Sequence, residues 1–189
     1  MVHSENHTAG VHQVYYQPSI SERYGTCSAD RTIRLWDANE YQVYARFSAP
    51  TGEPLCFTFT DEILISGWSD GKIRAYRVDT CEPLWTIDNA HKNEVSAIYL
   101  SPNLKFICTG GGEGDVRVWE IKSREMISHL KEHKSRITKL ELFSDGMHLL
   151  SASRDSAMLV WDLKEEKRVS SHVQRMGGIN GLGLGIAGD

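Results

Sequence analysis

The chain has 189 residues, with 21 Lys or Arg against 25 Asp or Glu, and a formal net charge of −4. No basic run exceeds two residues, so nucleic acid is an improbable class of partner, because clustered cations are needed to hold a phosphate backbone. The polar first ten residues lack a signal-peptide core, and no apolar stretch is long enough to span a membrane. We therefore expect a soluble protein of the cytoplasm.

Short strands, rather than helices, are predicted all along the chain. Segments such as VSAIYL at 95–100 and ITKLEL at 137–142 alternate apolar and polar residues and are rich in β-branched and aromatic types. Turn signals separate such segments, for example SDG at 69–71 and SPN at 101–103. No window keeps a helical period for more than about two turns. The pattern predicts an all-β fold.

One pattern with a period of about 42 residues recurs four times. Its copies are ADRTIRLWD, SDGKIRAYR, GEGDVRVWE and RDSAMLVWD, and their aromatic residues are Trp36, Tyr76, Trp119 and Trp161. The spacings between these aromatic residues are 40, 43 and 42 residues. A fixed period of this size indicates a repeat architecture in which each unit is one supersecondary element.

Three further polar positions keep step with the aromatic residue. Six residues before it stands an acid (Asp30, Asp70, Glu113 and Asp155), and four residues before each acid stands a hydroxyl (Thr26, Ser66, Thr109 and Ser151). Three of the four units also carry a histidine near their start (His7, His91 and His133). A hydrogen-bonded chain from the aromatic group through the hydroxyl and the imidazole to the carboxylate would satisfy buried polar groups.

The repeat predicts a propeller built from small sheets. Each unit supplies about four strands, and because such a sheet cannot bury both faces alone, the sheets must stack radially. We place the units at about 7–47, 48–88, 89–130 and 131–173, within a single partial propeller over residues 1–189. The start of a fifth unit is expected at 174–189, because Ile179 lies 42 residues after Ile137. We expect further blades or a partner chain to complete the ring.

These residues resemble the WD-repeat family, whose units carry Gly-His near the start and Trp-Asp at the end. The resemblance covers about residues 7–184. The second unit departs from it, since it has no histidine and carries Tyr76 and Arg77 in place of Trp-Asp, and Glu120 replaces the aspartate in the third unit. The resemblance implies weaker internal networks in those two blades.

Several stretches are similar, more narrowly, to the cilia- and flagella-associated WD-repeat proteins of axonemal doublet microtubules, within the second of their two propellers. They are SGWSDGKIRAY at 66–76, IDNAHKNEVSAI at 87–98, GGGEGDVRVWEI at 110–121 and LKEHKS at 130–135. The resemblance implies a structural scaffold of the ciliary or flagellar axoneme, in the cytoskeleton, that binds tubulin and other doublet proteins without a cofactor.

The alternative is a soluble adaptor, such as a substrate receptor of a ubiquitin ligase. Many receptors of that kind carry an arginine three residues after the repeat tryptophan, as W-D-x-R. Here those positions are Asn39, Lys122 and Lys164, which counts against the adaptor.

Catalytic and metal-binding readings of individual motifs are weaker than structural ones. GLGIAG at 183–188 fits a dinucleotide motif by its letters but lacks the helix and acid that should follow, and GGGEG at 110–114 is expected to be a hairpin. His3, His7 and His12 cluster without a cysteine or acid at ligand spacing, and the four cysteines form no CxxC pair. No GxSxG or HExxH motif is present, so we expect neither an enzyme nor a metal site.

Candidate contact positions lie just before each turn acid, at Ala29, Ser69, Gly112 and Arg154. Among them and their neighbours, we select Arg154 and Trp68 as partner contacts and expect both to be exposed. Arg34, Arg74 and Arg117 stand two residues before the repeat aromatic residue, on one side of the strand. They form either a basic stripe for an acidic surface or ion pairs with acids of neighbouring blades, and we favour the ion pairs.

Overall fold

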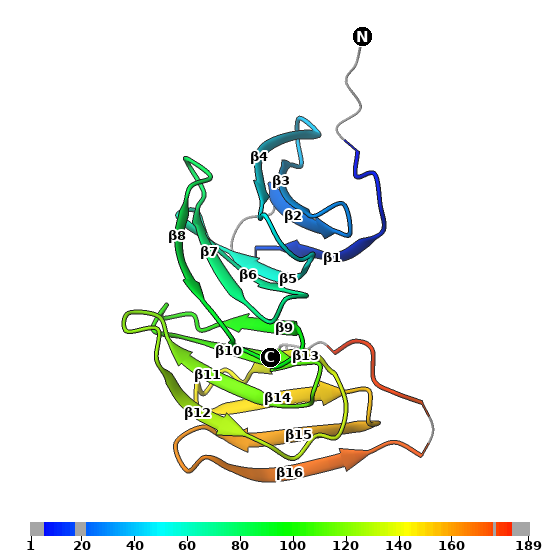
Figure 1. The fold of residues 1–189 in the computed structure, drawn as a ribbon. Helices are drawn as coiled ribbons and strands as arrows, with labels where there is room; N and C mark the ends of the chain where they lie inside the picture. Colours follow the sequence, from blue (N-terminus) through cyan, green and yellow to red (C-terminus); the bar gives the residue numbers. More distant parts are fainter. Residues whose placement is uncertain (1–5, 18–21, 176, 183–189) are drawn as a thin grey trace, which may run out of the picture. The chain divides into compact units, whose positions relative to one another are not determined.

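The computed structural model describes residues 6–17, 22–175 and 177–182, and these contain strands and turns but no helix. The strands form four sheets of four strands each (Figure 1). Within every sheet the strands are hydrogen-bonded in chain order and are all antiparallel. The predicted all-β fold with blade-like sheets is confirmed.

We number the sheets as blades 1 to 4 in chain order. Blade 1 contains β1 (Val11–Tyr16), β2 (Arg23–Ser28), β3 (Thr32–Asp37) and β4 (Gln42–Ser48). Blade 2 contains β5 (Pro54–Phe59), β6 (Ile63–Trp68), β7 (Ile73–Arg77) and β8 (Pro83–Ile87). Blade 3 contains β9 (Val95–Leu100), β10 (Phe106–Gly111), β11 (Val116–Glu120) and β12 (Met126–Leu130). Blade 4 contains β13 (Ile137–Leu142), β14 (His148–Ser153), β15 (Ala157–Asp162) and β16 (Lys167–Val173).

A β-bulge recurs beside the repeat aromatic residue in every blade. In blade 3 the pairing of β11 with β12 shifts between Val118 and Trp119, so that Ile127 is left between the two paired residues Met126 and Ser128. The same shift occurs in blades 1, 2 and 4. A bulge increases local twist and redirects side chains, so it shapes the outer edge of each blade.

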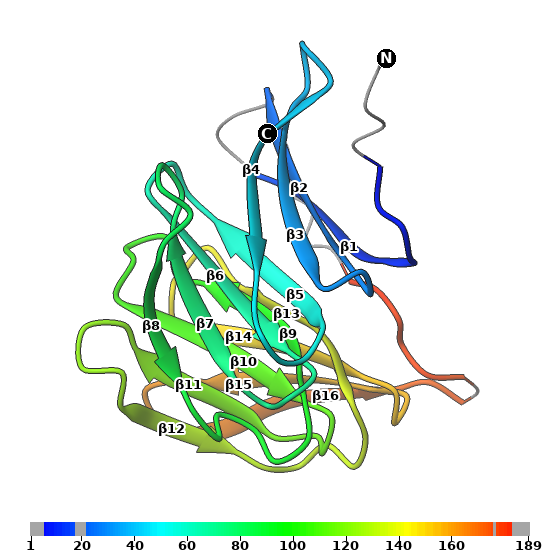
Figure 2. The same ribbon diagram turned by 45° about the horizontal axis from the view of Figure 1, so that its top comes forward.

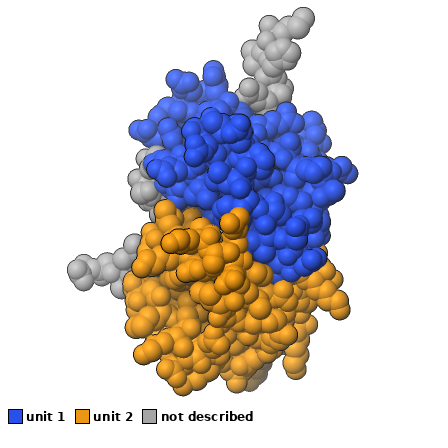
Figure 3. Space-filling view, turned by 60° about the vertical axis from the view of Figure 1, so that its left-hand side comes forward, with its two compact units in different colours: residues 1–90 blue, residues 91–189 orange. Residues whose placement is uncertain are grey.

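The chain divides into two compact units, residues 1–90 and residues 91–189, shown in blue and orange in Figure 3. Each unit contains two blades. An apolar sheet face must be covered, so the two blades of each unit pack face to face and bury an apolar cluster between them. The turns of the blades are best followed in Figure 2.

In the first unit, β1 and β2 of blade 1 pack on β5 of blade 2. Tyr15 meets Phe57 edge to face, with ring centroids 6.0 Å apart. Gly25 leaves room for the Phe57 ring, because a Cβ atom at Gly25 would lie 2.5 Å from Phe57 Cε2. The buried cluster contains Cys27, Ile33, Leu35, Ala45, Phe47, Phe57, Phe59, Leu64, Trp68, Tyr76 and Val78.

In the second unit, β9 and β10 of blade 3 pack on β13 of blade 4. The Ser96 hydroxyl donates a hydrogen bond of 2.7 Å to the carbonyl oxygen of Ile137 and so ties the two sheets together. The buried cluster contains Ala97, Cys108, Val116, Val118, Leu130, Ile137, Leu140, Leu142, Leu149, Leu159 and Trp161.

Ile179 meets blade 4 in the way that Ile137 meets blade 3. The Thr138 hydroxyl donates a hydrogen bond of 2.7 Å to the Ile179 carbonyl oxygen, as Ser96 does to Ile137. The Ile179 N–H donates to the Ser153 carbonyl oxygen at 3.1 Å. Residues 177–182 form no strand, and the motif at 183–188 lies outside the described residues. These bonds support the proposal that a fifth unit begins here.

Gly25→Ala tests the packing of blade 1 on blade 2. The added methyl group overlaps the Phe57 ring, so we expect a loss of about 1–3 kcal/mol in the free energy of unfolding, measured by urea denaturation. Gly10→Ala is the matched control, because a Cβ atom there meets nothing within 4 Å, and its effect should stay within about 0.5 kcal/mol. Equal effects of the two substitutions would contradict the packing described.

Candidate functional site

A chain of hydrogen bonds crosses blade 1 from its third strand to the residues before its first. The Trp36 indole N–H donates to the Thr26 hydroxyl oxygen at 2.8 Å, and Thr26 lies 2.7 Å from His7 Nε2. His7 Nδ1 lies 2.7 Å from an Asp30 carboxylate oxygen. Because an ionised carboxylate only accepts, Nδ1 carries the proton, and Nε2 accepts from Thr26. In this network the indole N–H, the hydroxyl and both imidazole nitrogens therefore each have a partner.

Blades 3 and 4 contain the same arrangement. In blade 3, Trp119 donates to Thr109 at 2.9 Å, and the two nitrogens of His91 meet Thr109 at 2.9 Å and Glu113 at 2.8 Å. In blade 4, Trp161 donates to Ser151 at 2.8 Å, and His133 meets Ser151 at 2.8 Å and Asp155 at 3.0 Å. The structure thus brings together the candidate residues of three units.

Blade 2 differs, and it corrects the expectation for Trp68. Trp68 is 0% exposed rather than a surface contact. Its indole N–H donates to the Ser66 hydroxyl at 2.8 Å, and the Arg74 guanidinium lies 4.8 Å from its ring centroid. Residues two apart on a strand point to the same face, so Trp68 reaches Ser66 along β6 itself. Trp68 therefore supplies the indole donor of a blade whose repeat aromatic residue is Tyr76.

Thr51 completes the polar cluster of blade 2, which has no histidine. Its hydroxyl donates to Asp70 at 2.8 Å, and Arg74 donates both to Thr51 at 3.1 Å and to Asp70 at 2.6 Å. Sequence reasoning missed Thr51 and the inward direction of Trp68. The available signal was Trp68 itself, which stands two residues after the repeat hydroxyl in the one unit that lacks both the repeat histidine and the repeat tryptophan.

The repeat arginines bind acids of their own blades. Arg34 donates to the turn acid Asp30 at 3.1 Å, as Arg74 does to Asp70, whereas Arg117 donates to Asp115 at 3.0 Å. We expected ion pairs with acids of neighbouring blades, but the acids that these arginines meet lie on the hairpin turns of their own blades, just before the strand that carries each arginine. In blade 3, His129 also meets Asp115, at 2.7 Å.

The turn acids are held in their ionised form. Burial opposes ionisation, but hydrogen bonds from Thr32 and His7 outweigh it and hold the pKa of Asp30 below its ordinary value. Burial likewise opposes ionisation of Glu113, but the bond from His91 together with backbone N–H groups lowers the pKa of Glu113 to about 2. The pKa of Asp155 is also lowered, since backbone N–H groups and His133 offset its burial.

The other groups that could suggest a ligand site or catalysis form a hairpin turn, an ion pair or part of the buried core. Residues 112–115 connect β10 to β11, and Gly114 takes a φ of +94°, so GGGEG forms a hairpin. His12 Nε2 lies 3.6 Å from a Glu53 carboxylate oxygen, while His3 lies outside the described residues. Burial raises the pKa of the Cys27 thiol to about 12.

The described residues contain neither a cluster of metal ligands nor a helix that could span a membrane. Within the described ranges, no group of three or more His, Cys, Asp or Glu residues could hold a metal ion. The same part of the chain contains no helix long and apolar enough to cross a membrane.

The candidate contact positions lie on the hairpin turns. Arg154 and Ser69 are exposed, whereas Ala29 and Gly112 are half-buried. The backbone of Arg154 is held by a hydrogen bond of 3.0 Å from its N–H to the Arg136 carbonyl oxygen. Its side chain is therefore presented from a fixed turn.

Comparison with known proteins places this architecture in a family. A family model described as WD domain, G-beta repeat matches residues 2–37, and one described as the anaphase-promoting complex subunit 4 WD40 domain matches residues 55–145. The chain belongs to the WD-repeat family. The recurring network of indole, hydroxyl, imidazole and carboxylate groups is the structural counterpart of that match.

Individual relatives extend over most of this WD-repeat chain. Cilia- and flagella-associated protein 52 of Homo sapiens is 32% identical over 86% of the chain, and that of Chlamydomonas reinhardtii is 34% identical over 87%. Apoptotic protease-activating factor 1 of Rattus norvegicus is 25% identical over 86% of the chain. The chain spans 27% of the length of the first two proteins and 13% of the third.

Thr109→Val tests the hydroxyl that serves both the indole and the imidazole. The substitution leaves the Trp119 N–H and His91 Nε2 buried without a partner, so we expect a loss of roughly 2–4 kcal/mol in the free energy of unfolding. Thr80→Val is the control, since the Thr80 hydroxyl bonds only to exposed Glu82. A loss below about 0.5 kcal/mol for Thr109→Val would show that the network does not hold the blade.

Glu113→Gln tests the charge of the network through pH. Because the pKa of Glu113 falls from 4.5 to about 2 on folding, its stabilisation is complete above pH 4.5 and is lost as the pH falls toward 2. The glutamine variant lacks this contribution. The difference in unfolding free energy between the two proteins should therefore shrink across this window in urea titrations. A difference that does not change with pH would contradict the assignment.

Proposed function

We propose that this chain is a non-catalytic protein-binding scaffold of the ciliary or flagellar axoneme, acting on doublet microtubules. The observation that carries the proposal is the identity of 32–34% over 86–87% of the chain to proteins named as cilia- and flagella-associated, from Homo sapiens and Chlamydomonas reinhardtii. The likeness covers both compact units, so it is not the likeness of one WD repeat alone.

The geometry of the networks supports a scaffold rather than an enzyme. In His7, His91 and His133 both ring nitrogens are already bonded within the blade. A general base needs a free nitrogen within reach of a substrate proton. These groups instead make each blade rigid, and a preorganised surface loses little entropy when it binds another protein.

Tubulin and other doublet proteins are the partners we propose. The hairpin turns carry side chains that differ from blade to blade, and Arg154 is an exposed one among them. A cation on a fixed turn suits an acidic surface such as that of tubulin, because it gains Coulomb energy with little loss of backbone entropy. We propose Arg154 as one such contact.

Localisation of the tagged full-length gene product tests the proposal. We expect fluorescence along cilia or flagella, and retention in axonemes after extraction with detergent and then with salt. A diffuse pool that detergent releases completely, or a source cell that never builds a cilium, would contradict it.

Arg154→Glu tests the proposed contact in the same cells. The reversed charge should repel an acidic surface, so the salt concentration that releases the protein from axonemes should fall. Arg124→Glu is the matched control, because Arg124 is also exposed but lies on the β11–β12 turn, at the opposite end of its blade. Identical salt release for both variants and the wild type would exclude Arg154 as a contact.

A further inference from the structure

The two blades of each unit meet through two different faces. The first blade presents its trailing face, which carries Tyr15 in blade 1, and the second presents its leading face, which carries Phe57 in blade 2. In the second unit the trailing face of blade 3 packs in the same way on the leading face of blade 4. The leading face of blade 1 and the trailing face of blade 4 take no part in either contact.

The leading face of blade 1 exposes apolar side chains whose counterparts are buried. Side chains alternate along a strand, so Val14 and Tyr16 point away from Tyr15 and from blade 2. Val14 and Tyr16 are 56% and 57% exposed. Val14 pairs with the residue that carries the repeat hydroxyl, which fixes the register of the repeat. The residues at the same two places, none more than 8% exposed, are Phe57 and Phe59 in blade 2 and Leu140 and Leu142 in blade 4.

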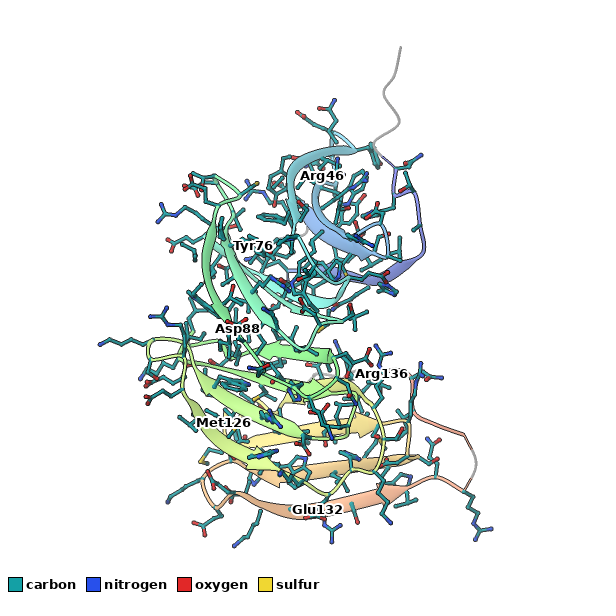
Figure 4. All side chains as sticks on the ribbon, in the orientation of Figure 1. Arg46, Tyr76, Asp88, Met126, Glu132 and Arg136 are labelled. Carbon is teal, nitrogen blue, oxygen red and sulfur yellow. The ribbon has the colours of Figure 1, made fainter. Side chains whose placement is uncertain are left out.

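Stacked aromatic rings extend this face across blade 1. Tyr16 stacks on Tyr24 and Tyr24 on Trp36, with ring centroids 5.3 and 6.0 Å apart. Tyr24 and Trp36 are only half-buried, whereas Leu64 and Tyr76 at the same places in blade 2 are at most 4% exposed (Tyr76 is labelled in Figure 4). An apolar surface that blade 1 covers in blade 2 is therefore open in blade 1 itself.

The trailing face of blade 4 shows the same contrast. Leu150, Met158 and Val160 are half-buried on it. The residues at the same places in blade 3, at most 3% exposed within the buried cluster, are Cys108, Val116 and Val118. Lys139 and Glu141 lie beside them on β13 and form an ion pair of 3.2 Å, so they add no net charge to this face.

Residues 177–182 cover one part of this trailing face. Ile179 is 8% exposed, and its carbonyl oxygen accepts a hydrogen bond of 2.7 Å from the Thr138 hydroxyl. Ser96 holds Ile137 on blade 3 by the same bond. Ile179 therefore occupies the place that the first-strand residue of a following blade takes.

Val11 is the residue of blade 1 that matches this place. It pairs with Ser28 as Ile137 pairs with Ser153, and it precedes Ile179 by 168 residues, which is four periods of the repeat. Val11 is 49% exposed, whereas Ile137 is fully buried. One chain thus carries both halves of the contact that joins its blades, and both halves are open.

We propose that the chain associates head to tail with a second copy of itself, through the leading face of blade 1 and the trailing face of blade 4. Val11 of one copy takes the place of Ile179 on the other, and the stacked aromatic rings with Val14 cover the apolar residues of blade 4. Because the two faces differ, a pair of copies leaves one of each free, and further copies can add. The proposal concerns the purified chain and does not depend on the ciliary location proposed above.

Sedimentation velocity of the whole chain tests the association. Because association follows mass action, the average sedimentation coefficient should rise over a roughly hundredfold range of protein concentration. Val14→Asp should weaken the association at least about tenfold, since it places a charge in an apolar contact. Met126→Asp is the matched control, because Met126 is 46% exposed but lies on β12 of blade 3, and it should associate like the wild type. A wild type that stays monomeric, or equal effects of the two substitutions, overturns the proposal.

Mixing two variants tests the head-to-tail arrangement. Val14→Asp disables the leading face alone and Met158→Asp the trailing face alone, so each variant by itself should be largely monomeric. In the mixture one intact face of each kind remains, so pairs should form and nothing larger. If Met158→Asp unfolds, Val160→Asp takes its place, since Val160 lies on the same face. A mixture of folded variants that stays monomeric overturns the arrangement.

Ile179→Asp tests the competition for blade 4. Burying an aspartate against blade 4 is costly, so residues 177–182 should leave the trailing face, and association should tighten roughly three- to tenfold. Asn180→Asp is the control, because Asn180 is exposed and its substitution should change nothing. Unchanged or weaker association in Ile179→Asp overturns the assignment of Val11 to the place of Ile179.

Discussion

The structure depends on a hydroxyl group shared by an indole and an imidazole. Thr26, Thr109 and Ser151 each accept an N–H from a tryptophan and donate to a histidine. Each hydroxyl lies on the second strand of its blade, the indole on the third, and the histidine before the first. One oxygen atom therefore links three segments of chain, and removing it would leave two buried groups unpaired at about 1–3 kcal/mol each.

Blade 2 shows how strong this constraint is. It lacks both the histidine and the repeat tryptophan, yet it keeps the hydroxyl of Ser66 and supplies an indole donor from Trp68 on the same strand. Thr51 and Arg74 then hold the turn acid, Asp70. The chemistry of the blade interior is thus preserved although the residues that perform it change.

The sequence predicts the fold well because its signals are local and periodic. Strand alternation and the 42-residue period are enough for an all-β chain of blade-like sheets. Trp68 was mispredicted because periodicity alone does not show which face of β6 is covered. The partners of Arg34 and Arg117 were mispredicted because their acids lie on adjoining hairpin turns, and a single sequence does not rank such distances.

The interior and the surface of each blade have different tasks. Hydrogen bonds and apolar clusters hold the interior of each blade, and the exposed turns carry different side chains from blade to blade. Such a division suits a protein whose role is binding, because a fixed frame presents side chains such as Arg154 at little entropic cost. The likeness to cilia- and flagella-associated proteins gives this frame a proposed location.

The tautomers of the three network histidines test the central account most directly. Nitrogen-15 NMR of the ring atoms of His7, His91 and His133, recorded above neutral pH on the whole chain, distinguishes a protonated from an unprotonated nitrogen. The account predicts a proton on Nδ1, bonded to the turn acid, and an unprotonated Nε2 that accepts from the shared hydroxyl in all three. A proton on Nε2 in any of them would contradict it, because the hydroxyl would then accept from both sides.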